Sequence, residues 1–268
     1  MIQLVMLGTG HAMVTKCYNT CFVLDSEKGS IMVDAGGGNG ILTQMEKAGL
    51  DWSNVKALFL THAHTDHILG VIWVIRQINS LIQHQKHPGS FKIYGHSEDL
   101  NYIKYSCDFL LCDPLSDGIQ FIPICEGTQL TECGIEFKVI DIHSTKKEQL
   151  GFRAVIKNED QECVMVCLGD EPCNEANEKY VMNADWLLSE AFCLKSEEEI
   201  FHPYTKHHST AYDAGQMAER LGVRNLVLYH TEDSDLKNRA RKYTEEARQN
   251  FQGNIFVPDD LDVINIIP

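Results

Sequence analysis

The chain alternates apolar runs with polar turns, and several longer segments space their apolar residues as helices do. Short apolar runs bounded by Gly, Ser or Asp predict β-strands. The expected strands are 2–7, 20–25, 30–35, 55–60, 91–95, 119–124, 135–144, 151–158, 162–170, 185–192 and 224–230. A polar turn at 158–161 is expected to join two of them.

Helical patterns lie at 40–50, 67–82, 97–110, 209–222 and 235–250. The segment 209–222 begins with a capping Ser or Thr and ends in Gly, as helices often do. Strands mixed with helices in this way predict a layered α/β protein. We expect a four-layer αββα sandwich, with two mixed sheets face to face and helices outside. No linker divides the chain, so one domain is expected over 1–268.

Composition narrows the range of partners. The 268 residues are 44% hydrophobic and carry a net charge of −15 with histidine neutral. Such a protein repels nucleic-acid phosphates over most of its surface, whereas a small anionic substrate needs only a local cationic centre. The ten cysteines form no C-x-x-C pair, and neither a signal peptide nor an apolar run of membrane length is seen. We therefore expect a cytoplasmic protein with reduced thiols and no membrane partner.

The stretch THAHTDH, at 61–67, places three histidines and an aspartate within seven residues. Alone, any one of these histidines is more simply a surface or capping residue. In H-x-H-x-D-H, however, His62 and His64 can point the same way from an extended segment, while Asp66 and His67 turn into the following helix. Four such residues after a buried strand predict a metal site, which this spacing can divide between two ions.

Other candidate ligands also stand directly after apolar strands. His143 follows FKVIDI, Asp170 follows VMVCLG and His230 follows LVLY. Buried strands hold their ends in fixed positions at one edge of a sheet, which is the rigidity that a metal site needs.

On these residues the sequence resembles the metallo-β-lactamase superfamily, and HSTAYDAGQMAERLGVRNLVLYH, LGTG and YNTCFVL resemble its ribonuclease Z branch. The resemblance implies a metallo-β-lactamase fold with two metal ions. One ion would be bound by His62, His64 and His143, the other by Asp66, His67 and His230, with Asp170 as the bridge. Asp34 would be a supporting residue beside the site. Zinc suits this ligand set, with manganese or iron left open, and a metal-bridging hydroxide would be the nucleophile.

Asp66 and His208 are the catalytic candidates that the resemblance implies. His208 precedes Ser-Thr, and we expect it to stabilise the phosphoryl group or protonate the departing oxygen. The same segment also reads as a helix cap, and both roles can hold together. His207 is expected to be a solvated neighbour, and His11 in the GTGHA turn is a weaker candidate for the cleft.

The sequence differs from ribonuclease Z in having no segment long enough for the arm with which that enzyme binds tRNA. Residues 144–169, between two of the expected ligands, suffice only for two strands and a turn. We therefore expect a metal-dependent hydrolase that acts on small phosphodiesters or nucleotides, cyclic nucleotides included, as a homodimer; tRNA is not expected as a partner. The alternatives are a ribonuclease Z-type tRNA 3′ endonuclease and a lactonase or thioesterase of the same fold.

Overall fold

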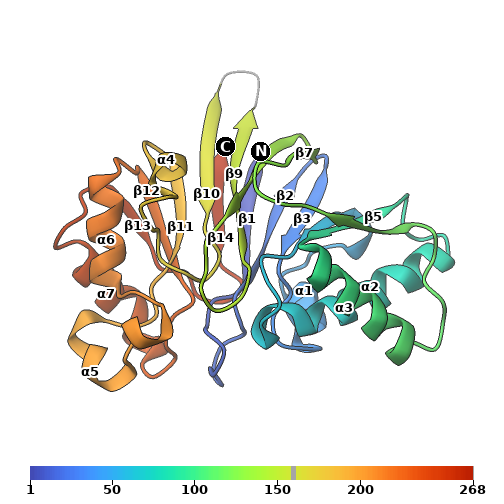
Figure 1. Ribbon diagram of the computed structural model, residues 1–268, viewed down its shortest axis with the longest axis horizontal. Helices are drawn as coiled ribbons and strands as arrows, with labels where there is room; N and C mark the ends of the chain where they lie inside the picture. The colour runs from blue at the N-terminus through green and yellow to red at the C-terminus, as the bar shows by residue number, and fades with distance from the viewer. Residues whose placement is uncertain (158–160, 268) are drawn as a thin grey trace.

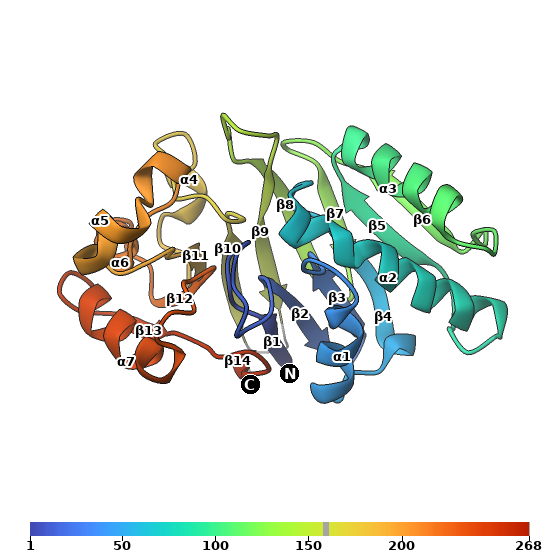
Figure 2. The same cartoon turned by 90° about the horizontal axis from the view of Figure 1, so that it is seen from below.

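Two seven-stranded sheets face each other, and helices cover the outer face of each sheet (Figures 1 and 2). This computed structural model describes residues 1–157 and 161–267. The four layers confirm the αββα sandwich expected from the sequence.

The first sheet is mixed. Its order is β14 (Val263–Ile267), β1 (Ile2–Gly8), β2 (Cys21–Ser26), β3 (Gly29–Val33), β4 (Val55–Phe59), β5 (Phe91–Gly95) and β6 (Ile119–Pro123). Strand β1 pairs antiparallel with both β14 and β2, whereas β3 to β6 run parallel. Helices α1 (Gly40–Lys47), α2 (Thr65–Gln83) and α3 (Ser97–Leu110) cover its outer face, as Figure 2 shows.

The second sheet is also mixed. Its order is β13 (Asn254–Phe256), β12 (Asn225–Tyr229), β11 (Trp186–Glu190), β10 (Glu162–Cys167), β9 (Leu150–Lys157), β8 (Ile135–Asp141) and β7 (Gln129–Glu132). Strands β7 to β10 are antiparallel and β10 to β13 parallel. The helices on its side are α4 (Glu178–Val181), α5 (Glu198–Phe201), α6 (Ala211–Arg220) and α7 (Leu236–Ala247). Short 3₁₀ turns lie at Trp52–Asn54, Lys195–Glu197 and Tyr204–Lys206.

Strands with both faces buried explain the uninterrupted apolar runs in the sequence. In β1, Leu4 and Met6 pack into the core between the sheets, while Val5 and Leu7 pack beneath the helices. A strand covered on both faces has no reason to alternate with polar residues. The central core draws on residues from Ile2 to Ile267. The single domain over 1–268 stays a prediction.

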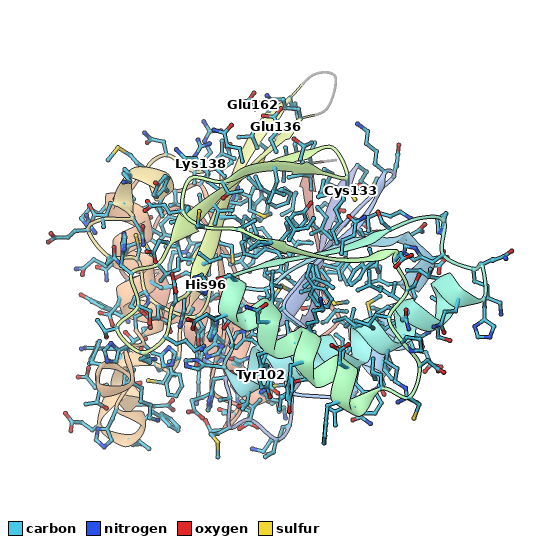
Figure 3. The ribbon with its side chains drawn as sticks, turned by 45° about the vertical axis from the view of Figure 1, so that its right-hand side comes forward. His96, Tyr102, Cys133, Glu136, Lys138 and Glu162 are labelled. Carbon is cyan, nitrogen blue, oxygen red and sulfur yellow. The ribbon has the colours of Figure 1, made fainter. Side chains whose placement is uncertain are left out.

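The expected elements are found with shifts of a few residues at their ends, but β7, β13 and β14 had not been expected. The paired strands β9 and β10 are confirmed; of their connecting turn, 158–160 lie outside the described residues. Lys157 Nζ lies 3.4 Å from Glu136 Oε1 and 3.7 Å from Glu162 Oε2, which joins β8, β9 and β10. Figure 3 labels Glu136 and Glu162, which lie close together. None of the helices in the described part of the chain has the length and apolar character needed to cross a membrane.

Candidate metal centre

The candidate site lies where strands of both sheets end. Asp34 follows β3, His62 follows β4, Asp170 follows β10 and His230 follows β12. Asp34 and His230 adopt left-handed backbone conformations, with φ of 54° and 58°. Non-glycine residues rarely do so, and such strain gathers at functional sites. The backbone therefore turns sharply at the strand ends.

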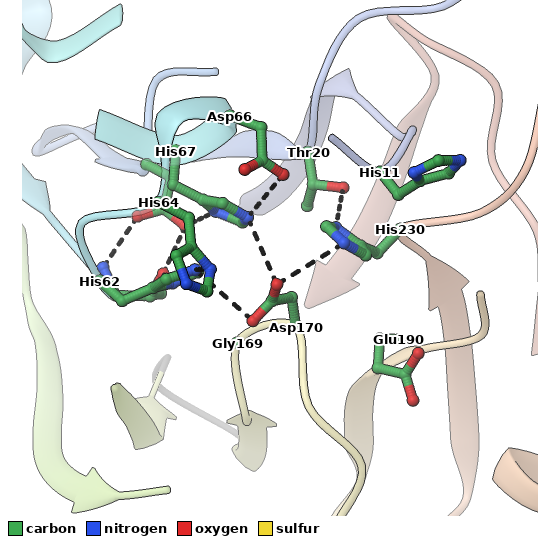
Figure 4. A network of polar contacts seen from close by, with 12 residues as sticks. His11, Thr20, His62, His64, Asp66, His67, Gly169, Asp170, Glu190 and His230 are labelled. Carbon is green, nitrogen blue, oxygen red and sulfur yellow. Dashed lines mark hydrogen bonds and ion pairs between the residues drawn. The ribbon is translucent and has the colours of Figure 1, made fainter. Parts of the chain in front are cut away.

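Asp170 is the centre of the cluster. Its Oδ1 lies 3.7 Å from His62 Nε2, and its Oδ2 lies 3.8 Å from His67 Nε2 and 3.6 Å from His230 Nε2. All four side chains are buried. Figure 4 shows the three imidazoles converging on this one carboxylate.

Each of these imidazoles contacts a second residue through Nδ1. Thr61 Oγ1 lies 2.9 Å from His62 Nδ1, Asp34 Oδ2 lies 2.7 Å from His67 Nδ1, and Thr20 Oγ1 lies 3.1 Å from His230 Nδ1. Contacts of this kind fix ring orientation and tautomer in metal sites, leaving Nε2 free to bind. The prediction that Asp34 supports the site agrees with this contact.

Polar atoms without partners show that the cluster suits a cation. His67 Nε2 and Asp170 Oδ1 are buried, and neither has a hydrogen-bond partner in the described part of the chain. Unpaired buried polar atoms are costly, so native structures rarely leave them without a ligand. Imidazole nitrogens together with carboxylate oxygens form a donor set for zinc and other divalent metals. The residues present therefore fit the two-metal site that the sequence predicts.

The pKa shifts of His62 and Asp170 also favour the binding of a cation. Burial lowers the pKa of His62 to about 4, against the opposing effect of Asp170. Burial opposes ionisation of Asp170, yet His62 and His230 hold the pKa of its carboxyl well below the usual value. His67 differs: burial is overcome by Asp34 and Asp66, which raise its pKa. A metal ion bound through His67 Nε2 would take the place of a proton on that atom.

His64 and Asp66 complete the inner group. His64 Nδ1 lies 2.8 Å from His62 Nε2, and Asp66 Oδ2 lies 3.4 Å from His67 Nε2. Asp66 lies in the first turn of α2, as the sequence predicts. The ligand atoms of Asp66, His67 and His230, which form the predicted second-ion set, all lie within 4.8 Å of one another.

His143 lies apart from this group. Its side chain is 44% exposed, and its Nδ1 lies 3.2 Å from Asp141 Oδ2. Together with Glu126 and Asp141 it forms a separate, largely exposed cluster. The structure thus brings together six of the seven predicted ligands, namely His62, His64, Asp66, His67, Asp170 and His230. The role of His143 as a ligand stays a prediction.

His208 lies beside the cluster, backed by a buried carboxylate. Glu190 Oε2 is 3.5 Å from His208 Nδ1, while Glu190 Oε1 accepts hydrogen bonds from Ser209 N and Oγ at 2.7 and 2.6 Å. Burial would lower the pKa of His208, but Glu190 and Asp170 raise it. A donor atom of His208 also lies within 4.8 Å of ligand atoms of Asp170 and His230, so His208 can serve as an acid or as a ligand. Thr210, not Ser209, caps α6.

A cavity of about 390 Å³ opens above the cluster, and its lining includes His64, Asp66, Asp170, His208 and His230. His11 also lines the cavity. Its Nε2 lies 3.1 Å from Glu232 Oε1, and its Nδ1 accepts from Met13 N at 3.2 Å. Both ring nitrogens are occupied, so His11 forms part of the wall.

Several supporting residues escaped sequence reasoning. Thr20 meets His230 across 210 residues of chain, and no local pattern signals such a contact. Glu190 could have been found, because it ends an apolar strand just as the predicted ligands follow theirs. Thr61 adjoins the histidine motif but resembles any residue at the end of a strand.

Solved structures share this architecture. Metallo-β-lactamase fold protein YhfI from Bacillus subtilis superposes with a TM-score of 0.78 at 17% identity, covering 98% of both chains. The short form of human tRNase Z gives a TM-score of 0.72 at 19% identity, covering 99% of this chain and 100% of the other. These likenesses establish the fold.

Sequence relatives are more informative. Ribonuclease Z of Thermococcus onnurineus is 26% identical over 313 residues, covering 98% of this chain and 94% of the relative. Ribonuclease Z of Mycobacterium sp. strain KMS is 25% identical over 296 residues, covering 100% of this chain and 97% of the relative. Fold, site and relatives define a metal-dependent hydrolase of the metallo-β-lactamase fold, a phosphodiesterase. The chain belongs to the anti-Pycsar protein Apyc1 family, whose model matches residues 2–244.

Proposed function

We propose that this protein hydrolyses small phosphodiesters, 3′,5′-cyclic nucleotides in particular, at the cluster centred on Asp170. One observation supports this proposal above all: the Nε2 atoms of three histidines converge on the buried carboxylate of Asp170. One oxygen of that carboxylate has no hydrogen-bond partner in the described part of the chain. Membership of the Apyc1 family supports a cyclic nucleotide as the substrate.

The predicted metal ligands fall into two sets, one for each ion. Asp66, His67 and His230 would hold one ion, His62 and His64 would hold the other with His143, and Asp170 would bridge them. When bound, two such ions lower the pKa of water towards about 7 and offset the charge of the phosphate oxygens. The Nδ1 contacts of Thr20, Asp34 and Thr61 keep the imidazoles aimed at Asp170.

His208 would serve the leaving group. The Glu190 carboxylate raises its pKa and so favours the protonated ring, which can give a proton to a departing ribose oxygen. In a cyclic nucleotide this oxygen stays on the product, so one protonation completes the opening of the ring. Asp66 is kept as a catalytic candidate alongside its role as a ligand.

Size and charge favour a small substrate. The cavity of about 390 Å³ is within the range of small-molecule sites. Residues 144–169 include β9 and β10, with residues 158–160 outside the described part, and the net charge is −15. Both features disfavour a long-range grip on folded RNA. Zinc as the metal, a homodimer and a cytoplasmic location stay predictions.

A tRNA 3′ endonuclease is the second candidate, because the ribonuclease Z relatives match nearly the whole chain. Metal-loaded protein should be given a 3′,5′-cyclic nucleotide and a precursor tRNA in one reaction, and the kcat/KM values compared. We expect the cyclic nucleotide to be favoured strongly. A higher kcat/KM for cleavage of precursor tRNA would replace the proposal with the second candidate, and turnover of lactones alone would refute both.

A further inference from the structure

Two lysines line the cavity above the candidate metal centre. Lys146 lies between β8 and β9, and Lys206 ends the 3₁₀ turn Tyr204–Lys206. Their loops touch, since Thr145 Oγ1 lies 3.3 Å from His207 Nδ1. Two lysines from distant parts of the sequence therefore line one cavity from adjoining loops.

Lys146 is only loosely paired. Its Nζ lies 3.9 Å from Glu171 Oε1, near the outer limit of an ion pair. That same oxygen already accepts a hydrogen bond of 2.6 Å from Ser144 Oγ. The ammonium thus has an anion nearby but is not saturated by it, and a flexible lysine can turn towards a bound anion.

Lys206 lies over the ring of Phe192, which stacks on His208. Its Nζ lies 4.7 Å from the centre of the Phe192 ring, and Phe192 stacks on His208 with ring centres 4.8 Å apart at 8°. Within residues 1–157 and 161–267, the structure shows no ion pair between Lys206 and a carboxylate. A cation over an aromatic face keeps most of its capacity for hydrogen bonding.

Hydrolysis of a phosphodiester changes the charge that these lysines meet. The oxygen of water bonds to phosphorus, one P–O ester bond breaks, and the departing oxygen gains a proton. The diester carries one negative charge, whereas the monoester formed loses a second proton with a pKa near ~6 and carries nearly two at pH 8. Cations outside the metal ligands therefore act more strongly on the product than on the substrate.

We propose that Lys146 and Lys206 form a binding subsite for a phosphate monoester dianion, so that the protein holds its product more tightly than its substrate. The subsite would make the product an inhibitor. The inference rests on the proposed function for the natural product, but its test needs only phosphate binding by metal-loaded protein.

Calorimetry with two probes tests the subsite without turnover of a nucleotide. Phenyl phosphate supplies the dianion, and diphenylphosphinate, which has no P–O ester bond to hydrolyse, supplies the monoanion, both at pH 8 with metal-loaded protein. In the double variant Lys146→Gln, Lys206→Gln we expect the Kd of phenyl phosphate to rise about tenfold and that of diphenylphosphinate about threefold or less. Lys146→Arg with Lys206→Arg should restore most of the affinity, because charge is the operative property.

Lys147→Gln is the matched control. It neighbours Lys146, yet its Nζ lies 3.6 Å from Asp99 Oδ1 and it does not line the cavity. Both Kd values should stay at the wild-type level in this variant. Equal increases for both probes in the double variant, or no increase for phenyl phosphate, would overturn the subsite. A protein that binds phenyl phosphate through the lysines but does not open cyclic nucleotides would refute the proposed function alone.

Discussion

Asp34 Oδ2 lies 2.7 Å from His67 Nδ1, and both groups are buried. Asp34 also accepts hydrogen bonds from Thr61 N and Thr61 Oγ1, at 2.8 and 2.7 Å. A single carboxylate thus fixes the orientation of His67 and the strand end that precedes His62. The metal centre is organised by residues that we do not expect to touch the metal.

We expect Asp34→Asn to weaken metal binding about 10–100-fold, the usual cost of losing a partner behind a metal ligand. Asparagine tolerates the left-handed conformation at this position, so the backbone should be kept. Titration with a competing chelator measures the affinity. Asp25→Asn is a matched control, because Asp25 pairs with Ser30 on neighbouring strands away from the centre. Equal affinity in Asp34→Asn and wild type would show that the contact has no part in binding.

His208→Ala should retain both metal ions and lose about 10²–10⁴-fold in rate, the range of general acid–base catalysis. The defect should shrink for a diester with a good leaving group, because p-nitrophenolate departs without protonation. Metal content and rate with bis-p-nitrophenyl phosphate and with a cyclic nucleotide check this. Loss of one ion would instead make His208 a ligand, as its proximity to Asp170 and His230 allows. His207→Ala should have little effect.

Gly70→Ala should destabilise the fold by about 1–3 kcal/mol, because a Cβ at this position in α2 would lie 1.8 Å from Ala35 O. The clash would also move the backbone beside Asp34. Gly38→Ala is the control, since nothing lies within 4 Å of a Cβ there, and it should stay within about 0.5 kcal/mol. Urea unfolding of the metal-free proteins measures both. Equal stability of the two variants would contradict the close packing of α2 on this loop.

Thiol reactivity should separate the cysteines by burial. Burial raises the pKa of Cys17 and Cys167 to about 11 and that of Cys163 to about 12. Only the thiolate reacts, and a thiol with a pKa of about 11 is ionised to about one part in a thousand at pH 8. Such a cysteine therefore reacts slowly. Cys112 and Cys125 are exposed. Mass spectrometry after brief maleimide treatment at pH 8 should find label mainly on these two. Equally rapid labelling of Cys163 or Cys167 would contradict the packing around them.

The sequence predicted the layers and most of the inner site for a common reason. Strands buried on both faces leave long apolar runs, and the ligands stand directly after those runs. The edge strands β7 and β13 are short, and β14 alternates buried with exposed residues, so their signals are weak. Thr20 and Glu190 act through contacts that only the folded chain brings together. The position of His143 also depends on a loop conformation that local sequence does not determine.

The number of metal ions per chain shows whether the cluster around Asp170 is a two-metal site. Metal-replete protein should be analysed by elemental and native mass spectrometry, with phosphodiesterase activity followed as metal is returned to the metal-free chain. We predict two ions per chain, activity that needs both, and loss of metal together with activity in Asp170→Ala, since Asp170 faces three imidazoles at once. Saturation at one ion, or an Asp170→Ala variant with full metal and full turnover, would contradict this prediction.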